Sequence, residues 1–223
     1  MKTTATTPTT PAPPKPLLRG WIHEAAFFAA IPAGVILVLS APTARSRIAA
    51  GVFAASLVGM YGISAAYHRG SWDPERKRAL KRIDHSMIYV LIAGTYTPFA
   101  LLVLRGTTAI VLLLVVWSGA AAGVALKVAK VDGLAALSGV LYIALGWLAV
   151  ALTPQLVRSL STTEVVLTAA GGVAYTLGAI VLAAHRPNPS PRVFGYHEVW
   201  HVLTVVGAAC HYVVMTLVVR GLR

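Results

Sequence analysis

Long apolar stretches separated by short polar segments dominate the pattern of this chain. Each stretch is close to the roughly 20 apolar residues that a helix needs to cross the hydrocarbon core of a bilayer. The seven predicted spans are roughly 22–41, 48–67, 83–104, 108–126, 134–153, 163–184 and 197–219. The pattern therefore predicts an all-α membrane protein, with a seven-helix transmembrane domain over residues 19–223.

Composition and charge narrow the class of partner. Of the 223 residues, 57% are hydrophobic and 12% are charged, a balance too apolar for a soluble domain of this size. The formal net charge is +12, but the basic residues fall in loops between apolar stretches, which favours anionic lipid headgroups over nucleic acid. Residues 1–18 are rich in Thr and Pro and are predicted to form a disordered cytoplasmic tail.

The distribution of Lys and Arg predicts the orientation, because short cytoplasmic loops carry an excess of these residues. With a cytoplasmic N-terminus, 13 of the 19 basic residues face the cytoplasm. Six of them lie in the segment 69–82, where Asp73 and Pro74 form an N-cap and first-turn pair. We expect a short basic helix, Glu75–Arg82, that contacts anionic headgroups. The C-terminus is then outside, and the chain is a multi-pass protein of the plasma (inner) membrane.

Histidines collect at the cytoplasmic ends of the predicted spans. His197 and His201 are four residues apart, which places both on one face of a helix about 6 Å apart along its axis. Two nitrogen ligands at this spacing favour zinc, and His68 supplies a third from the end of the second span. Asp84 enters the third span at the same depth, where it can bind the metal or hold and deprotonate a metal-bound water, and Ser64 lies one turn below His68.

The sequence thus predicts a Zn²⁺ site with His68, His197 and His201 as ligands and Asp84 and Ser64 as catalytic candidates. Taken singly, each interfacial histidine is more often a hydrogen-bonded packing residue, and the common depth of the group favours the site. The remaining histidines are interpreted individually as packing residues: His23, His85, His185 and His211.

Residues 197–201 also match H-E-x-x-H, the helix motif of metalloproteases, with Glu198 in the position of the general base. This short match supports an intramembrane metalloprotease as a minor alternative. Such an enzyme needs a distal acidic ligand, for which Asp132 or Asp84 would have to serve.

Four separated motifs resemble one known family. They are Ser64–His68 (S-x-x-x-H), Arg82–His85 (R-I-D-H), Ala93–Phe99 (A-G-T-Y-T-P-F) and Gly195–His201 (G-Y-H-E-V-W-H). Over residues 19–219 the chain is similar to the hemolysin III group within the progestin and adipoQ receptor (PAQR) superfamily, which is related more widely to alkaline ceramidases.

The resemblance implies a seven-helix bundle with its N-terminus inside and zinc bound by His68, His197 and His201. It also implies that Asp84 contacts the metal-bound water and that Ser64 lies near the site. The adiponectin-receptor branch is associated with hydrolysis of ceramide-like amides, whereas bacterial members carry the hemolysin name for a pore-forming, cytolytic activity. Two functions stay open: a zinc-dependent hydrolase of a membrane lipid, and a non-enzymatic pore-forming or membrane-regulating protein with structural zinc.

Overall fold

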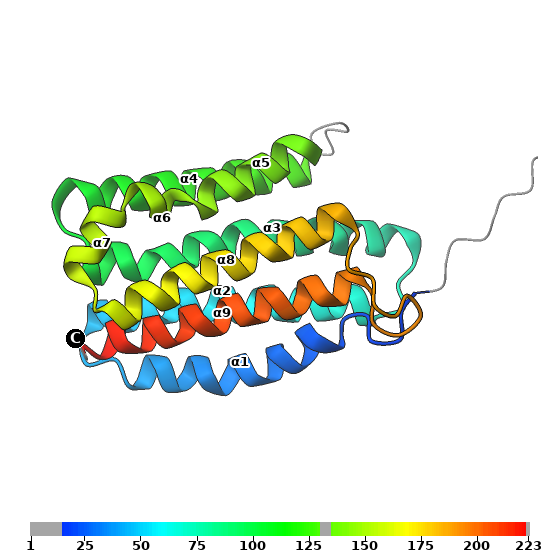
Figure 1. The fold of residues 1–223 in the computed structure, drawn as a ribbon, viewed down its shortest axis with the longest axis horizontal. Coiled ribbons are helices and arrows are strands. Elements are labelled where there is room, and N and C mark those ends of the chain that lie inside the picture. The colour runs from blue at the N-terminus through cyan, green and yellow to red at the C-terminus, as the bar shows by residue number, and fades with distance from the viewer. Residues whose placement is uncertain (1–14, 130–134, 222–223) are drawn as a thin grey trace, which may run out of the picture.

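Long helices lying side by side make up almost all of the computed structural model, which describes residues 15–129 and 135–221 (Figure 1). No β-strand occurs within these two ranges. The elements are α1 (Trp21–Leu39), α2 (Ala44–Arg69), α3 (Pro74–Pro98), the π-helix η1 (Phe99–Val103), α4 (Gly106–Val128), α5 (Ala135–Gly146), α6 (Leu148–Ala151), α7 (Thr153–Ser159), α8 (Thr162–Ala184) and α9 (Tyr196–Arg220).

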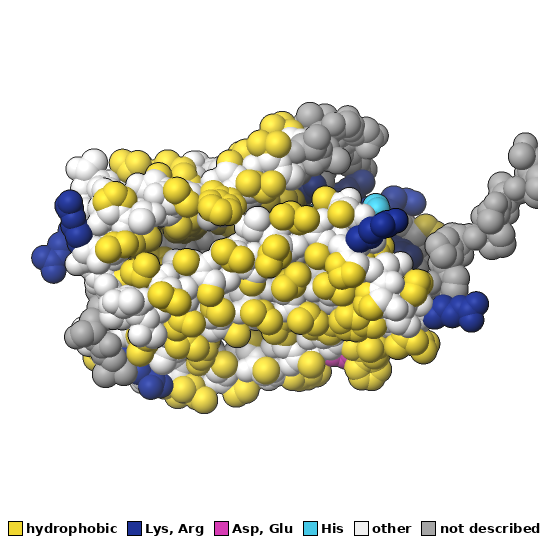
Figure 2. Space-filling view, viewed as in Figure 1, with side chains coloured by type: hydrophobic (Ala, Val, Ile, Leu, Met, Phe, Trp, Pro, Cys, Tyr) yellow, Lys and Arg dark blue, Asp and Glu magenta, His cyan; other side chains and the backbone are white. Residues whose placement is uncertain are grey.

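The bundle has the surface of a multi-pass membrane protein. Six helical units of the described chain are long and apolar enough to cross a bilayer: α1, α2, α3 with η1, α4, α8 and α9. A bent unit, Gly139–Ala151 followed by Thr153–Ser159, makes a seventh if it crosses as one. Hydrophobic side chains cover the long face seen in Figure 2, and Lys and Arg stand at its two ends. The predicted all-α membrane class is confirmed, with six or seven spans.

The region of the fifth predicted span, 134–153, is broken. It contains α5 and α6 and runs into α7, and the unit Gly139–Ala151 meets Thr153–Ser159 at an angle of 53°. Pro154 accounts for this bend, because a proline ring clashes with the carbonyl four residues earlier and disfavours helix in the residue before it. At the upstream break, the Tyr96 hydroxyl donates to Gly146 O and accepts from Ala149 N, both at 2.8 Å. Backbone groups freed by this break therefore have a partner within the bundle.

The basic helix expected at Glu75–Arg82 is not a separate element. Asp73 caps it as predicted, since its Oδ1 accepts from Glu75 N at 3.1 Å and from Arg76 N at 2.9 Å. The helix then continues as α3 to Pro98. Neither Gly nor Pro occurs between Glu75 and Asp84, so nothing in this stretch breaks the helix. The basic residues form the first turns of the third span.

The structure describes only residues 15–18 of the tail predicted over 1–18. Residues 1–14 lie outside the described ranges, but Leu17 N donates to Arg192 O and Leu18 N to Val193 O, both at 3.0 Å. Composition alone does not reveal such pairing with a distant loop. These bonds attach the segment 15–20 to the loop between α8 and α9, at the end of the bundle where the loop between α2 and α3 also lies (Figure 1).

The interior is apolar along most of its length and polar at that same end. Leu37, Phe53, Tyr89 and Met215 are among the largest fully buried side chains. Several buried polar side chains lie near the start of α1, the end of α2, the middle of α3 and the start of α9: His23, Ser64, His68, Asp84, Glu198 and His201. Because burying polar groups is costly unless they are paired, this cluster is the strongest candidate for a functional site.

Candidate metal centre

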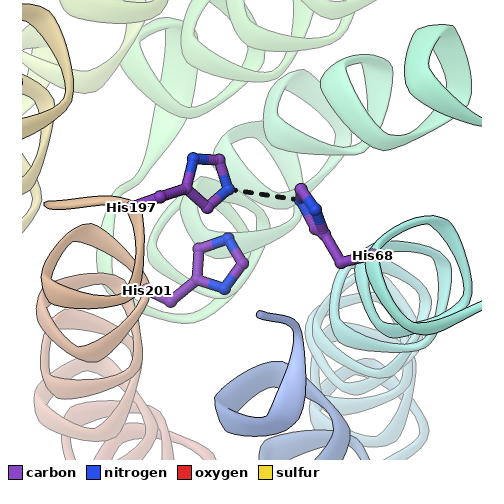
Figure 3. Close-up of side chains that lie close together, drawn as sticks. All are labelled: His68, His197 and His201. Carbon is purple, nitrogen blue, oxygen red and sulfur yellow. Dashed lines mark hydrogen bonds between the residues drawn. The ribbon is translucent and has the colours of Figure 1, made fainter. Parts of the chain in front are cut away.

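Two helix ends bring three histidines together. The last turn of α2 carries His68, and the first two turns of α9 carry His197 and His201 on one face (Figure 3). The side chains of His68 and His201 are buried, and that of His197 is half-buried. The structure thus assembles the three predicted ligands from segments more than a hundred residues apart in the chain.

The separations between the histidine nitrogens suit one small metal ion. The Nε2 atoms of His68 and His197 are 3.3 Å apart, and one nitrogen from each of the three rings lies within 4.8 Å of the others. Tetrahedral zinc with Zn–N bonds of about 2.0–2.1 Å places two nitrogen ligands about 3.3–3.4 Å from each other. The His68–His197 separation matches this value, and His201 offers a third nitrogen within 4.8 Å of the other two.

Buried polar atoms without a partner also indicate a missing ligand at this point. Within the described ranges, both ring nitrogens of His201 and Oδ1 of Asp84 are buried with no hydrogen-bond partner. Leaving such an atom unsatisfied costs about 1–3 kcal/mol. The other carboxylate oxygen, Asp84 Oδ2, lies 3.9 Å from His68 Nε2. Three imidazoles and an adjoining carboxylate are the donor types that hold zinc together with a water molecule, so the residues fit this metal.

His23 belongs to the site, although sequence reasoning treated it as a packing residue. Its ring stacks on that of His201, with centroids 3.7 Å apart and planes 5° from parallel. His23 Nδ1 is 2.8 Å from Ser64 Oγ, and Nε2 is 3.1 Å from Thr204 Oγ1. The available signal was the position of His23 at the start of the first span, at the same end as the other site histidines.

Glu198 has a structural task in the described structure. Its side chain is fully buried, and Oε1 accepts from Arg19 Nε at 2.5 Å. The second oxygen, Oε2, accepts from Gly195 N at 2.8 Å, which satisfies a backbone donor at the start of α9. Both oxygens are therefore engaged away from the histidine nitrogens, and this arrangement does not suit the general base of an H-E-x-x-H protease. Asp132, the distal ligand considered for that reading, lies outside the described ranges.

Basic side chains stand over this end of the bundle. Lys15 Nζ donates a hydrogen bond to the carbonyl oxygen of His68, which places a cation at the C-terminal end of α2. Partial burial and the nearby charges of Arg19, Lys77 and Arg69 lower the pKa of Lys15 from its ordinary value. Several positive charges thus lie within mutual electrostatic reach beside the three histidines.

Comparison with known proteins adds a whole-chain observation. A family model described as haemolysin-III related matches residues 12–212. The chain belongs to the haemolysin-III-related family. It is similar to the hemolysin-3 homolog of Bacillus subtilis (strain 168), with 34% identity over 193 residues that cover 85% of this chain and 87% of the relative. Hemolysin-3 of Bacillus cereus is 33% identical over 190 residues, or 84% of each chain. The monocyte to macrophage differentiation factor of Homo sapiens is more distant, with 24% identity over 198 residues that cover 86% of this chain and 79% of that protein.

In this haemolysin-III-related protein, the motifs that carried the resemblance have distinct places. Ser64–His68 ends α2, Arg82–His85 lies in the first half of α3, and Gly195–His201 begins α9, so these three surround the candidate metal centre. The fourth motif, Ala93–Phe99, lies farther along α3, where Tyr96 contacts the break in the fifth span. Family membership is confirmed, and three of its four motifs meet at one site.

Proposed function

We propose that this haemolysin-III-related protein is a zinc-dependent hydrolase that cleaves an amide or ester bond of a ceramide-like membrane lipid. The proposal depends on one observation: nitrogens of His68, His197 and His201 converge within 4.8 Å beside a buried carboxylate whose Oδ1 has no partner in the described structure. These three histidines would hold the metal. Three protein ligands leave the fourth position of a tetrahedral ion open for chemistry.

The chain's own residues supply the proton transfers. The chemistry that zinc contributes in such a site is activation of water and polarisation of a carbonyl group. Asp84 Oδ1 accepts the proton of the attacking water and passes it to the leaving nitrogen or oxygen, so that an amide yields a carboxylic acid and an amine. Ser64 is the second catalytic candidate, and its hydroxyl must turn from His23 toward the substrate to act as an oxyanion donor.

The surroundings of the site favour a lipid substrate. The helices around it present apolar side chains on the long face of the bundle, which suits acyl chains (Figure 2). The first turns of α3 and the residues Lys15, Arg19 and Arg69 add positive charge at the same end, which suits anionic headgroups. We assign this end to the cytoplasmic leaflet of the plasma (inner) membrane from the excess of Lys and Arg in its loops.

A structural role for zinc is the second candidate function, and one observation favours it. His68 ends α2 while His197 and His201 begin α9, so a metal held by all three would cross-link helices 129 residues apart in sequence. Such a link stabilises a bundle without any reaction. The protein would then act on the membrane without catalysis, as a pore-forming or membrane-regulating protein.

Metal analysis tests the site itself. Purified full-length protein in detergent is expected to hold about one zinc ion per chain, and His197→Ala is expected to hold much less, because the set loses one of three nitrogens. The matched control is His211→Ala, a buried histidine of α9 that faces Thr168 on α8 instead of the site. Equal zinc in the wild type and in His197→Ala would refute the proposed ligand set.

Turnover separates catalytic from structural zinc. Asp84→Asn is expected to keep the fold and the zinc but to lose at least about a hundredfold in hydrolysis of a ceramide and acyl-amide panel, because the amide cannot take the proton. Mass spectrometry of the released fatty acid measures this. A zinc-loaded wild type that cleaves no member of the panel, or an Asp84→Asn variant with full turnover, would refute the hydrolase.

A further inference from the structure

His201 lacks the hydrogen bond that ordinarily orients a metal-binding histidine. In most sites, the nitrogen that does not bind the metal donates to a carboxylate or a carbonyl, and this bond holds the ring in place. Both nitrogens of His201 are buried, and neither has such a partner in the described structure. A different contact must therefore fix the plane of this ring.

The stacked ring of His23 is that contact. The two imidazoles are 3.7 Å apart and almost parallel, and neither side chain is exposed to solvent. His23 comes from α1, so it supports His201 from a helix that carries none of the three proposed ligands. Rotation of the His201 ring out of its plane would collide with His23.

His23 is itself held at both ring nitrogens. His23 Nε2 lies 3.1 Å from Thr204 Oγ1, and His23 Nδ1 lies 2.8 Å from Ser64 Oγ. In either neutral tautomer one of these ring nitrogens donates and the other accepts, so both hydroxyls can hold the ring. With Ser64 on α2 and Thr204 on α9, these bonds fix His23 between the two helices that carry the proposed ligands.

Ser64 also lies within hydrogen-bonding reach of the carboxylate of Asp84. The hydroxyl of Ser64 therefore connects the ring of His23 with the acid of the proposed site.

We propose that His23 is a positioning residue, which sets the plane of His201 for metal binding through ring stacking. This inference depends on the proposed metal centre. Helix α1 thereby contributes to the site, although it carries none of the proposed ligands and the spacing of the histidines does not point to it. His23 offers no nitrogen to the metal, since both of its ring nitrogens are engaged by Ser64 and Thr204, and it acts through His201.

Zinc affinity of ring variants tests the inference without any assay of activity. Competition with a chelating indicator is measured for the full-length wild type, His23→Ala, His23→Gln and His23→Phe. We expect His23→Ala to weaken zinc binding about 10- to 100-fold, the range for residues that orient a ligand. His23→Gln keeps hydrogen-bonding groups but no ring, and should resemble His23→Ala. His23→Phe keeps the stacked ring and should recover most of the affinity.

Cobalt substitution supplies a second measurement. The visible absorption of bound Co²⁺ reports its coordination, so His23→Ala should change the spectrum while His23→Phe should resemble the wild type. The control is again His211→Ala, which is expected to match the wild type in affinity and spectrum. Helical circular dichroism identifies any variant that fails to fold; if His23→Ala fails, the comparison of His23→Phe with His23→Gln decides.

The outcomes distinguish a failure of the role of His23 from a failure of the proposed metal centre on which that role depends. A wild type that binds no zinc refutes the metal centre, and the role of His23 with it. A wild type that binds zinc with His23→Ala unchanged overturns the role of His23 alone. If His23→Phe binds as weakly as His23→Ala, ring stacking is not the means of positioning and the inference is also overturned.

Discussion

The Arg19→Met substitution leaves the carboxylate of Glu198 buried without its cation. In the wild type, Arg19 Nε and Glu198 Oε1 are 2.5 Å apart, with 20% of the Arg19 side chain and none of the Glu198 side chain exposed. Met fills much of the volume of the Arg stem but brings no charge. The segment 15–20 would then be attached to α9 mainly through the loop before that helix.

The expected loss of stability follows from this burial. Removing one partner of a buried ion pair costs about 3–5 kcal/mol, and we expect about 3 kcal/mol here because Arg19 retains some contact with solvent. Glu198→Gln should cost about 1.5–3 kcal/mol, since its amide oxygen can still accept from Gly195 N but the charged bond to Arg19 is lost. Both changes remove the same interaction, so the double variant should cost about 1–3 kcal/mol less than the sum.

Unfolding of the purified protein in mixed micelles, followed by helical circular dichroism, measures the four members of this cycle. Arg69→Met is the matched control, because the Arg69–Glu24 pair has 37% and 34% of its side chains exposed. An exposed pair of this kind contributes about 0–1 kcal/mol. Effects of Arg19→Met and Glu198→Gln that simply add would refute the coupling of this buried pair.

The same variants decide the chemical role of Glu198. Glu198→Gln is expected to keep zinc and most of the turnover of folded protein, because its carboxylate faces Arg19 and Gly195. A folded, zinc-loaded Glu198→Gln variant without turnover would instead make Glu198 the general base of an H-E-x-x-H enzyme. That result would also remove the assignment of this task to Asp84.

Three further predictions concern the supports of the site and of the fold. Gly20 has φ +85°, and a Cβ at this position would lie 2.7 Å from His68 Cβ. Gly20→Ala should therefore lower the free energy of unfolding by about 1–3 kcal/mol and weaken zinc binding. Gly172→Ala, which has open space at its Cβ, is the control in the same unfolding and metal assays. Tyr96→Phe removes the hydroxyl that donates to Gly146 O and accepts from Ala149 N, and should lower the free energy of unfolding by about 1–3 kcal/mol. Backbone hydrogen exchange at the break in the fifth span should become faster, while exchange in α9 should be unchanged. For wild-type protein kept at a free zinc concentration 100 times its Kd, removal of the zinc by a chelator should lower the free energy of unfolding by about 2.7 kcal/mol. An apoprotein as stable as the zinc-loaded form would contradict this prediction.

Local rules account for much of what the sequence predicted correctly. Six of the apolar stretches form long membrane-type helices, because an apolar run of sufficient length satisfies its backbone only as a helix in lipid. The cap at Asp73 followed from the preference of short polar residues for that position. The break in the fifth span was not predicted, and the separate basic helix was wrong. Both depend on where a helix breaks or continues, which Pro154 and the start of α3, free of Gly and Pro, decide.

The sequence by itself determined which side chains were available for the site and the helix ends at which they lie. His197 and His201 share a face because of the helical repeat, and His68 and Asp84 were at the same predicted depth as this pair. Tertiary structure alone decided which of the polar groups touch. The stack of His23 on His201 depends on how α1 packs against α2 and α9, and the pairing of Glu198 with Arg19 depends on where the segment 15–20 folds back. Such contacts join residues nearly 180 positions apart, where spacing along the chain carries no information about distance.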